Sequence, residues 1–122
     1  VFDSERWQLV GALDTDSRDA KLRKTTPDSF LRTPLDAWLS EHAVKRVVVC
    51  GYSSEFCVDT TVRRAAALGY EVVLAADAHT SHDKPHATGA QIRAHHNATL
   101  SDITSFGVPI RAIASAEVVF GD

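Results

Sequence analysis

The chain has 122 residues, of which 44% are hydrophobic and 24% are charged, a composition typical of one globular domain. Its formal net charge of -3 argues against a nucleic-acid partner or a membrane-surface partner, because both select basic surfaces. No apolar run approaches the roughly 18 residues that a membrane-spanning helix needs. The chain begins at Val1 and contains no Met, so we expect either a processed chain or a piece of a longer one.

Cys50 and Cys57 are the two cysteines, fewer than a secreted chain of this size held together by disulfides would carry. Their spacing is not that of a C-x-x-C redox motif. We therefore predict a reducing, cytoplasmic setting and no disulfide between them.

Helical and strand patterns alternate after a polar first segment. We expect a helix over 34–43, a strand over 46–50 closed by Gly51, a helix from Ser54 that ends at Gly69, a strand over 71–76 that stops at Asp77, a helix over 84–96, and a strand over 110–113. Helical crossovers between strands indicate parallel pairing. The sequence thus predicts one α/β domain over 1–122, a doubly wound parallel sheet with helices on both faces.

Two of the predicted helices carry an apolar stripe that should face the core. In the first, the stripe includes His42, which we place on the buried side: Leu35, Trp38, Leu39 and His42. In the second, the stripe begins at the cysteine: Cys57, Val58, Thr61, Val62, Ala65, Ala66 and Leu68.

Cys57 is a candidate nucleophile because of its position. Ligands of open parallel sheets bind at the carboxyl ends of the strands, and Cys57 follows such an end. With Ser54 as N-cap, Cys57 falls in the first helical turn, where free N–H groups and the helix dipole favour a thiolate and can bind an oxyanion. The alternative is that Cys57 is a small buried hydrophobe of the apolar stripe.

The histidines offer two further hypotheses. His79 follows the next strand and could approach Cys57 as a proton acceptor. The segment from Asp77 to His86 holds three His and two Asp, which suggests a metal site, although Pro85 interrupts it and a solvated loop is the more common outcome.

The string from Val47 to Ala78 resembles the isochorismatase-like cysteine hydrolases, a superfamily that includes nicotinamidases, N-carbamoylsarcosine amidases and streptothricin hydrolase. The matching positions are Cys57, Val58, Thr61, Ala65, Gly69, Tyr70, Asp77 and Ala78, and upstream Lys24, Phe30, Thr33 and Leu35. The resemblance implies a hydrolase of a C–N bond in a small amide or lactam, acting through a covalent acyl-enzyme without a cofactor, and a homo-oligomer.

The resemblance also implies roles for individual residues. Cys57 would be the nucleophile and Lys24 would stabilise its thiolate. A non-proline cis peptide would lie at Tyr52-Ser53 and direct the N–H of Ser53, together with that of Cys57, at the oxyanion. Tyr52 and Phe30 would line the substrate pocket, unless they are core aromatic residues.

One part of the family pattern has no counterpart. The acid-base aspartate of the family ends an N-terminal strand followed by a long helix, and neither Asp3 nor the polar cluster with Asp14, Asp16 and Asp19 matches that pattern. We therefore expect the N-terminal strand and helix to be missing from this chain. The zinc ligands of some nicotinamidases would also lie upstream, so we assign no metal. A truncated, non-catalytic relative that binds a ligand or partner remains the alternative to an enzyme.

Overall fold

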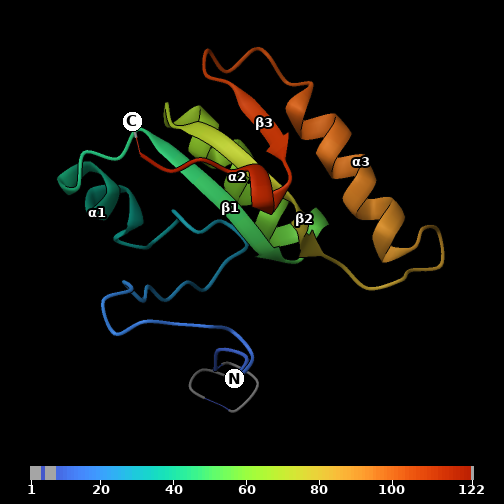
Figure 1. Cartoon of the computed structure of the whole chain (residues 1–122), viewed down its shortest axis with the longest axis horizontal. Helices are drawn as coiled ribbons and strands as arrows, with labels where there is room; N and C mark the ends of the chain where they lie inside the picture. The colour runs from blue at the N-terminus through green and yellow to red at the C-terminus, as the bar shows by residue number, and fades with distance from the viewer. Residues whose placement is uncertain (1–3, 5–7, 122) are drawn as a thin grey trace.

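Three parallel strands in the order β1-β2-β3 form the centre of the computed structural model, which describes residue 4 and residues 8–121 (Figure 1). The elements are α1 (Leu35–Glu41), β1 (Arg46–Tyr52), the π-helical turn η2 (Ser54–Val58), α2 (Asp59–Ala67), β2 (Glu71–Thr80), α3 (Gly89–Ser101), β3 (Ile110–Ile113) and the 3-10 turn η3 (Ser115–Glu117). The predicted α/β architecture with parallel strands and helical crossovers is confirmed.

The two longer strands extend beyond their predicted ends. Gly51 does not close β1: it pairs with His79 of β2, after a shift in register that follows Val49. At Gly51 the backbone has φ of 119°, a conformation that favours glycine. The register of β1 against β2 therefore shifts at this glycine, and the strand continues beyond it. Asp77 likewise does not stop β2, which runs on to Thr80.

Helix α3 begins five residues later than expected, at Gly89. Its N-terminus is a capping box: the Thr88 hydroxyl accepts from the Gln91 N–H, and the Gln91 side chain accepts from the Thr88 N–H. Lys84 and Ala87 instead pair in an isolated antiparallel bridge. Pro85 therefore lies in a turn and does not start the helix.

The core lies between the helices and one face of the sheet. Its fully buried members include Val62 and Ala65 of α2, Leu74 of β2 and Leu100 of α3. The predicted stripe on α2 is confirmed from Val58 to Ala66, whereas Leu68 is exposed. Gly69 has φ of 97°, as expected for a glycine that ends a helix.

The first helix corrects one prediction. Leu39 is buried and Trp38 is partly buried, as expected. His42, however, follows the end of α1 and is exposed, with its ring stacked on that of Trp38 at 4.1 Å. Because α1 ends at Glu41, the helical spacing does not carry His42 into the core.

The second face of the sheet is crossed by the C-terminal residues. In Figure 1, η3 lies in front of the sheet and α2 lies behind it. Asp77 accepts from both the N–H and the hydroxyl of Ser115, at 2.7 and 2.8 Å, and Arg46 donates to the carbonyls of Val119 and Gly121. The two faces of the sheet are thus covered unequally. Helix α2 covers one face, whereas the helical turn η3 on the other face has three residues (Figure 1).

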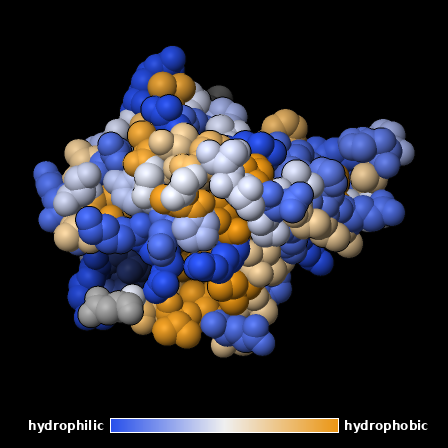
Figure 2. All heavy atoms as spheres, turned by 90° about the horizontal axis from the view of Figure 1, so that it is seen from above, coloured by the Kyte–Doolittle hydropathy of each residue, from blue (hydrophilic) through white to orange (hydrophobic). Residues whose placement is uncertain are grey.

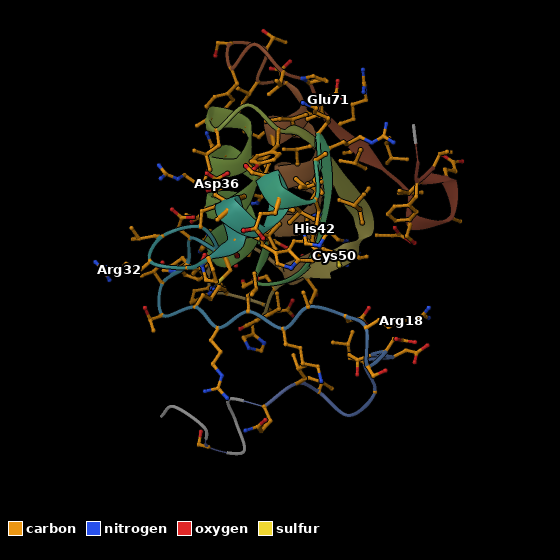
Figure 3. The ribbon with its side chains drawn as sticks, turned by 90° about the vertical axis from the view of Figure 1, so that its left-hand side faces the viewer. Arg18, Arg32, Asp36, His42, Cys50 and Glu71 are labelled. Carbon is orange, nitrogen blue, oxygen red and sulfur yellow. The ribbon has the colours of Figure 1, made fainter. Side chains whose placement is uncertain are left out.

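The segment around Arg18 runs apart from the helices and strands, as Figure 1 and Figure 3 show. Polar and apolar side chains are interspersed on the face seen in Figure 2. Within the described part of the chain, no helix has the length and apolar character to cross a membrane.

Candidate active site

The candidate nucleophile lies in the turn that joins β1 to α2. The peptide bond between Tyr52 and Ser53 is cis, as the family resemblance implies. The carbonyl of Ser53 then accepts from the N–H groups of both Phe56 and Val58, each at 3.1 Å. These bonds form the turn η2, and Cys57 lies between the two donors along the chain. The cap residue is Ser53 and not the predicted Ser54.

Lys24 contacts Cys57 directly. The ammonium nitrogen of Lys24 lies 3.2 Å from the sulfur of Cys57 and donates to the carbonyl of Thr26 at 2.8 Å. Both Lys24 and Cys57 are partly buried. A positive charge at this distance stabilises negative charge on sulfur. Cys50, by contrast, is exposed, and both thiols are free of disulfides.

Thr61 holds the segment that carries Lys24 against α2. Its hydroxyl accepts from the N–H of Ser29 at 3.1 Å and lies 2.9 Å from the Ser29 hydroxyl and 3.3 Å from the Pro27 carbonyl. Thr61 is one helical turn beyond Cys57. The same short stretch of chain therefore carries the sulfur that Lys24 contacts and the hydroxyl that binds the Lys24 segment. This gives the family threonine a physical role that the sequence pattern alone does not supply.

Glu55 forms a second cluster on the same turn, one that the sequence analysis did not single out. Its carboxylate accepts from the hydroxyls of Ser53 and Ser81 and lies 3.3 Å from the ammonium of Lys84. Burial alone would raise the pKa of Glu55, but the bonds from Ser53, Ser81 and Lys84 lower the pKa to about 2. Glu55 therefore ties the cis-peptide residue to the loop after β2 as a carboxylate.

The two aromatic residues assigned to the substrate pocket have different positions. Tyr52 is 57% exposed, and its ring meets the edge of His82 with the centroids 5.3 Å apart. Phe30 is 7% exposed and stacks on Tyr70 at 6.0 Å within the core. The position of Phe30 favours the core alternative left open by the sequence, whereas Tyr52 is accessible beside the nucleophile turn.

His79 is not beside Cys57. Its Nδ1 lies 2.7 Å from the Ser54 hydroxyl and its Nε2 lies 2.8 Å from Oδ1 of Asn97. Both ring nitrogens are thus engaged elsewhere, so the hypothesis of a Cys57–His79 pair is wrong for this arrangement.

The side chains expected as metal ligands between Asp77 and His86 have separate partners. Asp77 binds Ser115, His82 contacts Tyr52, and Asp83 accepts from the N–H of Gly89. Among residue 4 and residues 8–121, no three His, Cys, Asp or Glu side chains come together as metal ligands would. The structure therefore does not support a metal-dependent hydrolase built from the segment between Asp77 and His86.

A cavity of about 580 Å³ lies between the turn η2 and α3. Its wall includes Phe56 and Glu55 of η2 and His95 and His96 of α3, but not Cys57. The ammonium of Lys84 lies 4.8 Å from the centre of the Phe56 ring. This cavity is therefore separate from the contact between Lys24 and Cys57.

A family model described as an isochorismatase domain matches residues 1–109, so the chain belongs to the isochorismatase family. Streptothricin hydrolase of Streptomyces noursei is 41% identical over 83 residues, which cover 68% of this chain and 33% of that protein. The superfamily resemblance seen in the sequence is thereby confirmed. The chain spans about a third of this relative's length.

Solved structures agree in fold. A crystal structure of an isochorismatase family protein has a TM-score of 0.82 and 37% identity, covering 93% of this chain and 65% of that one. A nicotinamidase of Staphylococcus aureus has a TM-score of 0.60 and 28% identity, covering 74% of this chain and 53% of that one. An isochorismatase family protein and a nicotinamidase thus share the fold of this chain.

Proposed function

We propose that the protein is a cysteine hydrolase of a C–N bond in a small amide or lactam. The observation that carries this proposal is the 3.2 Å contact between the ammonium of Lys24 and the sulfur of Cys57. A lysine placed on a partly buried cysteine at the end of a parallel strand supplies what an activated thiolate needs. The names streptothricin hydrolase and nicotinamidase among the relatives support the substrate class.

The proposed reaction has two steps. The thiolate of Cys57 attacks the amide carbonyl, a C–S bond forms, and the C–N bond breaks as the amine takes up a proton and leaves. Water then attacks the thioester, the C–S bond breaks, and the acid and the thiolate of Cys57 are released, while a proton of water replaces the one that the amine took up. No redox partner or cofactor is needed for either step, and we assign none.

Backbone donors would stabilise the oxyanion of both tetrahedral intermediates. We assign this role to the N–H groups of Ser53 and Cys57, which flank the turn where the attacked carbonyl would lie. The bonds from Ser53 and Ser81 to Glu55 support the assignment, because they restrain the side chain of Ser53. Tyr52 is accessible at the same turn and is the aromatic residue that we assign to substrate contact.

The leaving amine also needs a proton donor. The family resemblance implies an aspartate for this task, but in the described part of the chain the hydrogen-bond partners of Lys24 are the Thr26 carbonyl and Cys57, with no carboxylate among them. Asp3 lies outside the described residues. The second candidate is a non-catalytic relative that binds a ligand or partner, and the experiment below separates the two.

The wider setting of the enzyme is also part of the proposal. We propose a small-molecule substrate, with neither nucleic acid nor membrane as partner, in keeping with the net charge of -3. A homo-oligomer would complete the substrate pocket with side chains of a neighbouring subunit. Two free thiols suit a reducing cytoplasm.

The proposal is tested with a panel of nicotinamide, carbamoyl compounds and streptothricin-type lactams. We expect turnover of at least one member. Acid quenching during turnover should then trap an acyl group, measured as added intact mass and mapped to the peptide that holds Cys57. If no member of the panel is hydrolysed while a compound of the panel binds, the non-catalytic candidate is correct.

A further inference from the structure

A buried line of hydrogen bonds joins the nucleophile turn to β2 and α3. Oγ of Ser54 lies 2.7 Å from Nδ1 of His79, Nε2 of His79 lies 2.8 Å from Oδ1 of Asn97, and Nδ2 of Asn97 donates to the Ala76 carbonyl at 2.9 Å. Ser54 is 0% exposed and His79 is 1% exposed. Two polar side chains of this line are thus fully buried, and the proposed chemistry uses neither.

The protons of this line can be assigned from its far end. The carbonyl of Ala76 can only accept, so the amide nitrogen of Asn97 must face it and Oδ1 must face His79. Oδ1 also can only accept, so Nε2 of His79 carries the proton. A neutral ring has one N–H, so Nδ1 of His79 accepts from the hydroxyl of Ser54.

The surroundings keep His79 neutral. Burial lowers the pKa of His79, and the charges of His96 and Arg93 lower it further, while the bond to Asn97 acts in the opposite direction. A neutral ring suits the line, because a second ring proton on Nδ1 would make Oγ of Ser54 the acceptor and leave the Ser54 hydroxyl proton without an acceptor in the line. The direction of every bond in the line is therefore fixed by one protonation state.

Ser54 connects this line to the reactive turn. It is the first residue of η2, it follows the cis peptide, and Cys57 is three residues further on. Its neighbour Ser53 provides the carbonyl that accepts from Phe56 and Val58. Fixing the side chain of Ser54 therefore fixes the start of the turn relative to β2 and α3.

We propose that Ser54, His79 and Asn97 form a positioning relay that sets the orientation of the Cys57 turn. In this relay His79 acts as a neutral acceptor for Ser54 and exchanges no proton with Cys57. The inference rests on the proposed function for its kinetic consequence, because a misplaced sulfur slows attack more than it weakens substrate binding. The relay itself is a property of the fold and has readouts that need no substrate.

The first test replaces the hydroxyl. We expect Ser54→Ala to lower kcat at least tenfold with less than a threefold change in KM, and to slow iodoacetamide labelling of Cys57 at least threefold relative to Cys50 in the same protein. Ser54→Thr keeps a hydroxyl and should recover most of both values. Ser105→Ala removes an exposed hydroxyl remote from the turn and should change neither.

The second test is nuclear magnetic resonance of the histidine ring nitrogens in the wild-type protein, which does not depend on a variant that folds. We expect His79 to be neutral with its proton on Nε2. A folded Ser54→Ala protein with wild-type kcat and wild-type labelling of Cys57 would overturn the relay, and so would a proton on Nδ1. If the wild-type protein hydrolyses no amide, the proposed function fails, while the labelling ratio and the ring protonation still decide the relay.

Discussion

The ammonium of Lys24 contacts the sulfur of Cys57 at 3.2 Å, although 33 residues separate them in the sequence. The contact joins a segment without helix or strand to the turn after β1. The segment has no regular structure of its own, and the hydrogen bonds of Thr61 with Ser29 and Pro27 attach it to α2 close to Lys24 in the sequence. We propose that the reactivity of Cys57 depends on this charge, which a residue outside the turn η2 supplies.

Replacing Lys24 by Met should remove that charge while keeping much of the side-chain volume. We expect iodoacetamide to label Cys57 at least tenfold more slowly at pH 7, because the thiolate loses its ammonium neighbour. Lys21→Met removes an exposed lysine three residues away and is the matched control. Equal labelling rates in the two variants would show that Lys24 does not activate the thiol.

Replacing Thr61 by Val should loosen the Lys24 segment. The variant keeps the shape of the side chain but leaves the N–H of Ser29 without its acceptor. We expect a loss of about 1–2 kcal/mol in the free energy of unfolding, measured by urea denaturation, together with slower labelling of Cys57. Thr60→Val makes the same chemical change at the adjacent helical position, and none of these bonds involves Thr60, so it should cause neither effect.

Acid should weaken the fold through Glu55. The pKa of Glu55 is about 2 in the folded protein, below the ordinary value of 4.5, so its ionised form is the one that folding favours. Its contribution to stability is therefore complete above pH 4.5 and is lost as the pH falls toward 2. We expect Glu55→Gln to reduce the loss of unfolding free energy across this interval, whereas Glu117→Gln, at an exposed site, should leave the wild-type slope. Identical slopes in all three proteins would contradict the assigned pKa.

The sequence predicts the parallel strands well because their signals are local. Short β-branched runs flanked by glycine define β1, and the apolar stripe defines α2. The predicted strand ends are less accurate, because the end of β1 depends on the pairing of Gly51 with His79 on the next strand. No local pattern in the sequence reveals this pairing. The start of α3 was recoverable: Thr88 and Gln91 have the spacing of a capping box, a stronger signal than Pro85.

The site depends more on tertiary structure than the strands do. Lys24 is one of several basic residues in its segment, and its link to Cys57 came from the family resemblance and not from spacing. The cluster around Glu55 and the relay through His79 each join residues from different elements. The tertiary fold brings the partners of these hydrogen bonds together, so no periodicity in the sequence predicts them.

Turnover by matched cysteine variants tests the central claim most directly. With any amide that the wild-type protein hydrolyses, we predict that Cys57→Ala lowers kcat at least a thousandfold while circular dichroism shows a folded protein, because the variant has no atom that can form the acyl-enzyme. Cys50→Ala should keep kcat within about threefold of wild type, since no step of the proposed reaction uses the Cys50 thiol. Near-normal turnover by the Cys57→Ala protein would contradict the covalent mechanism.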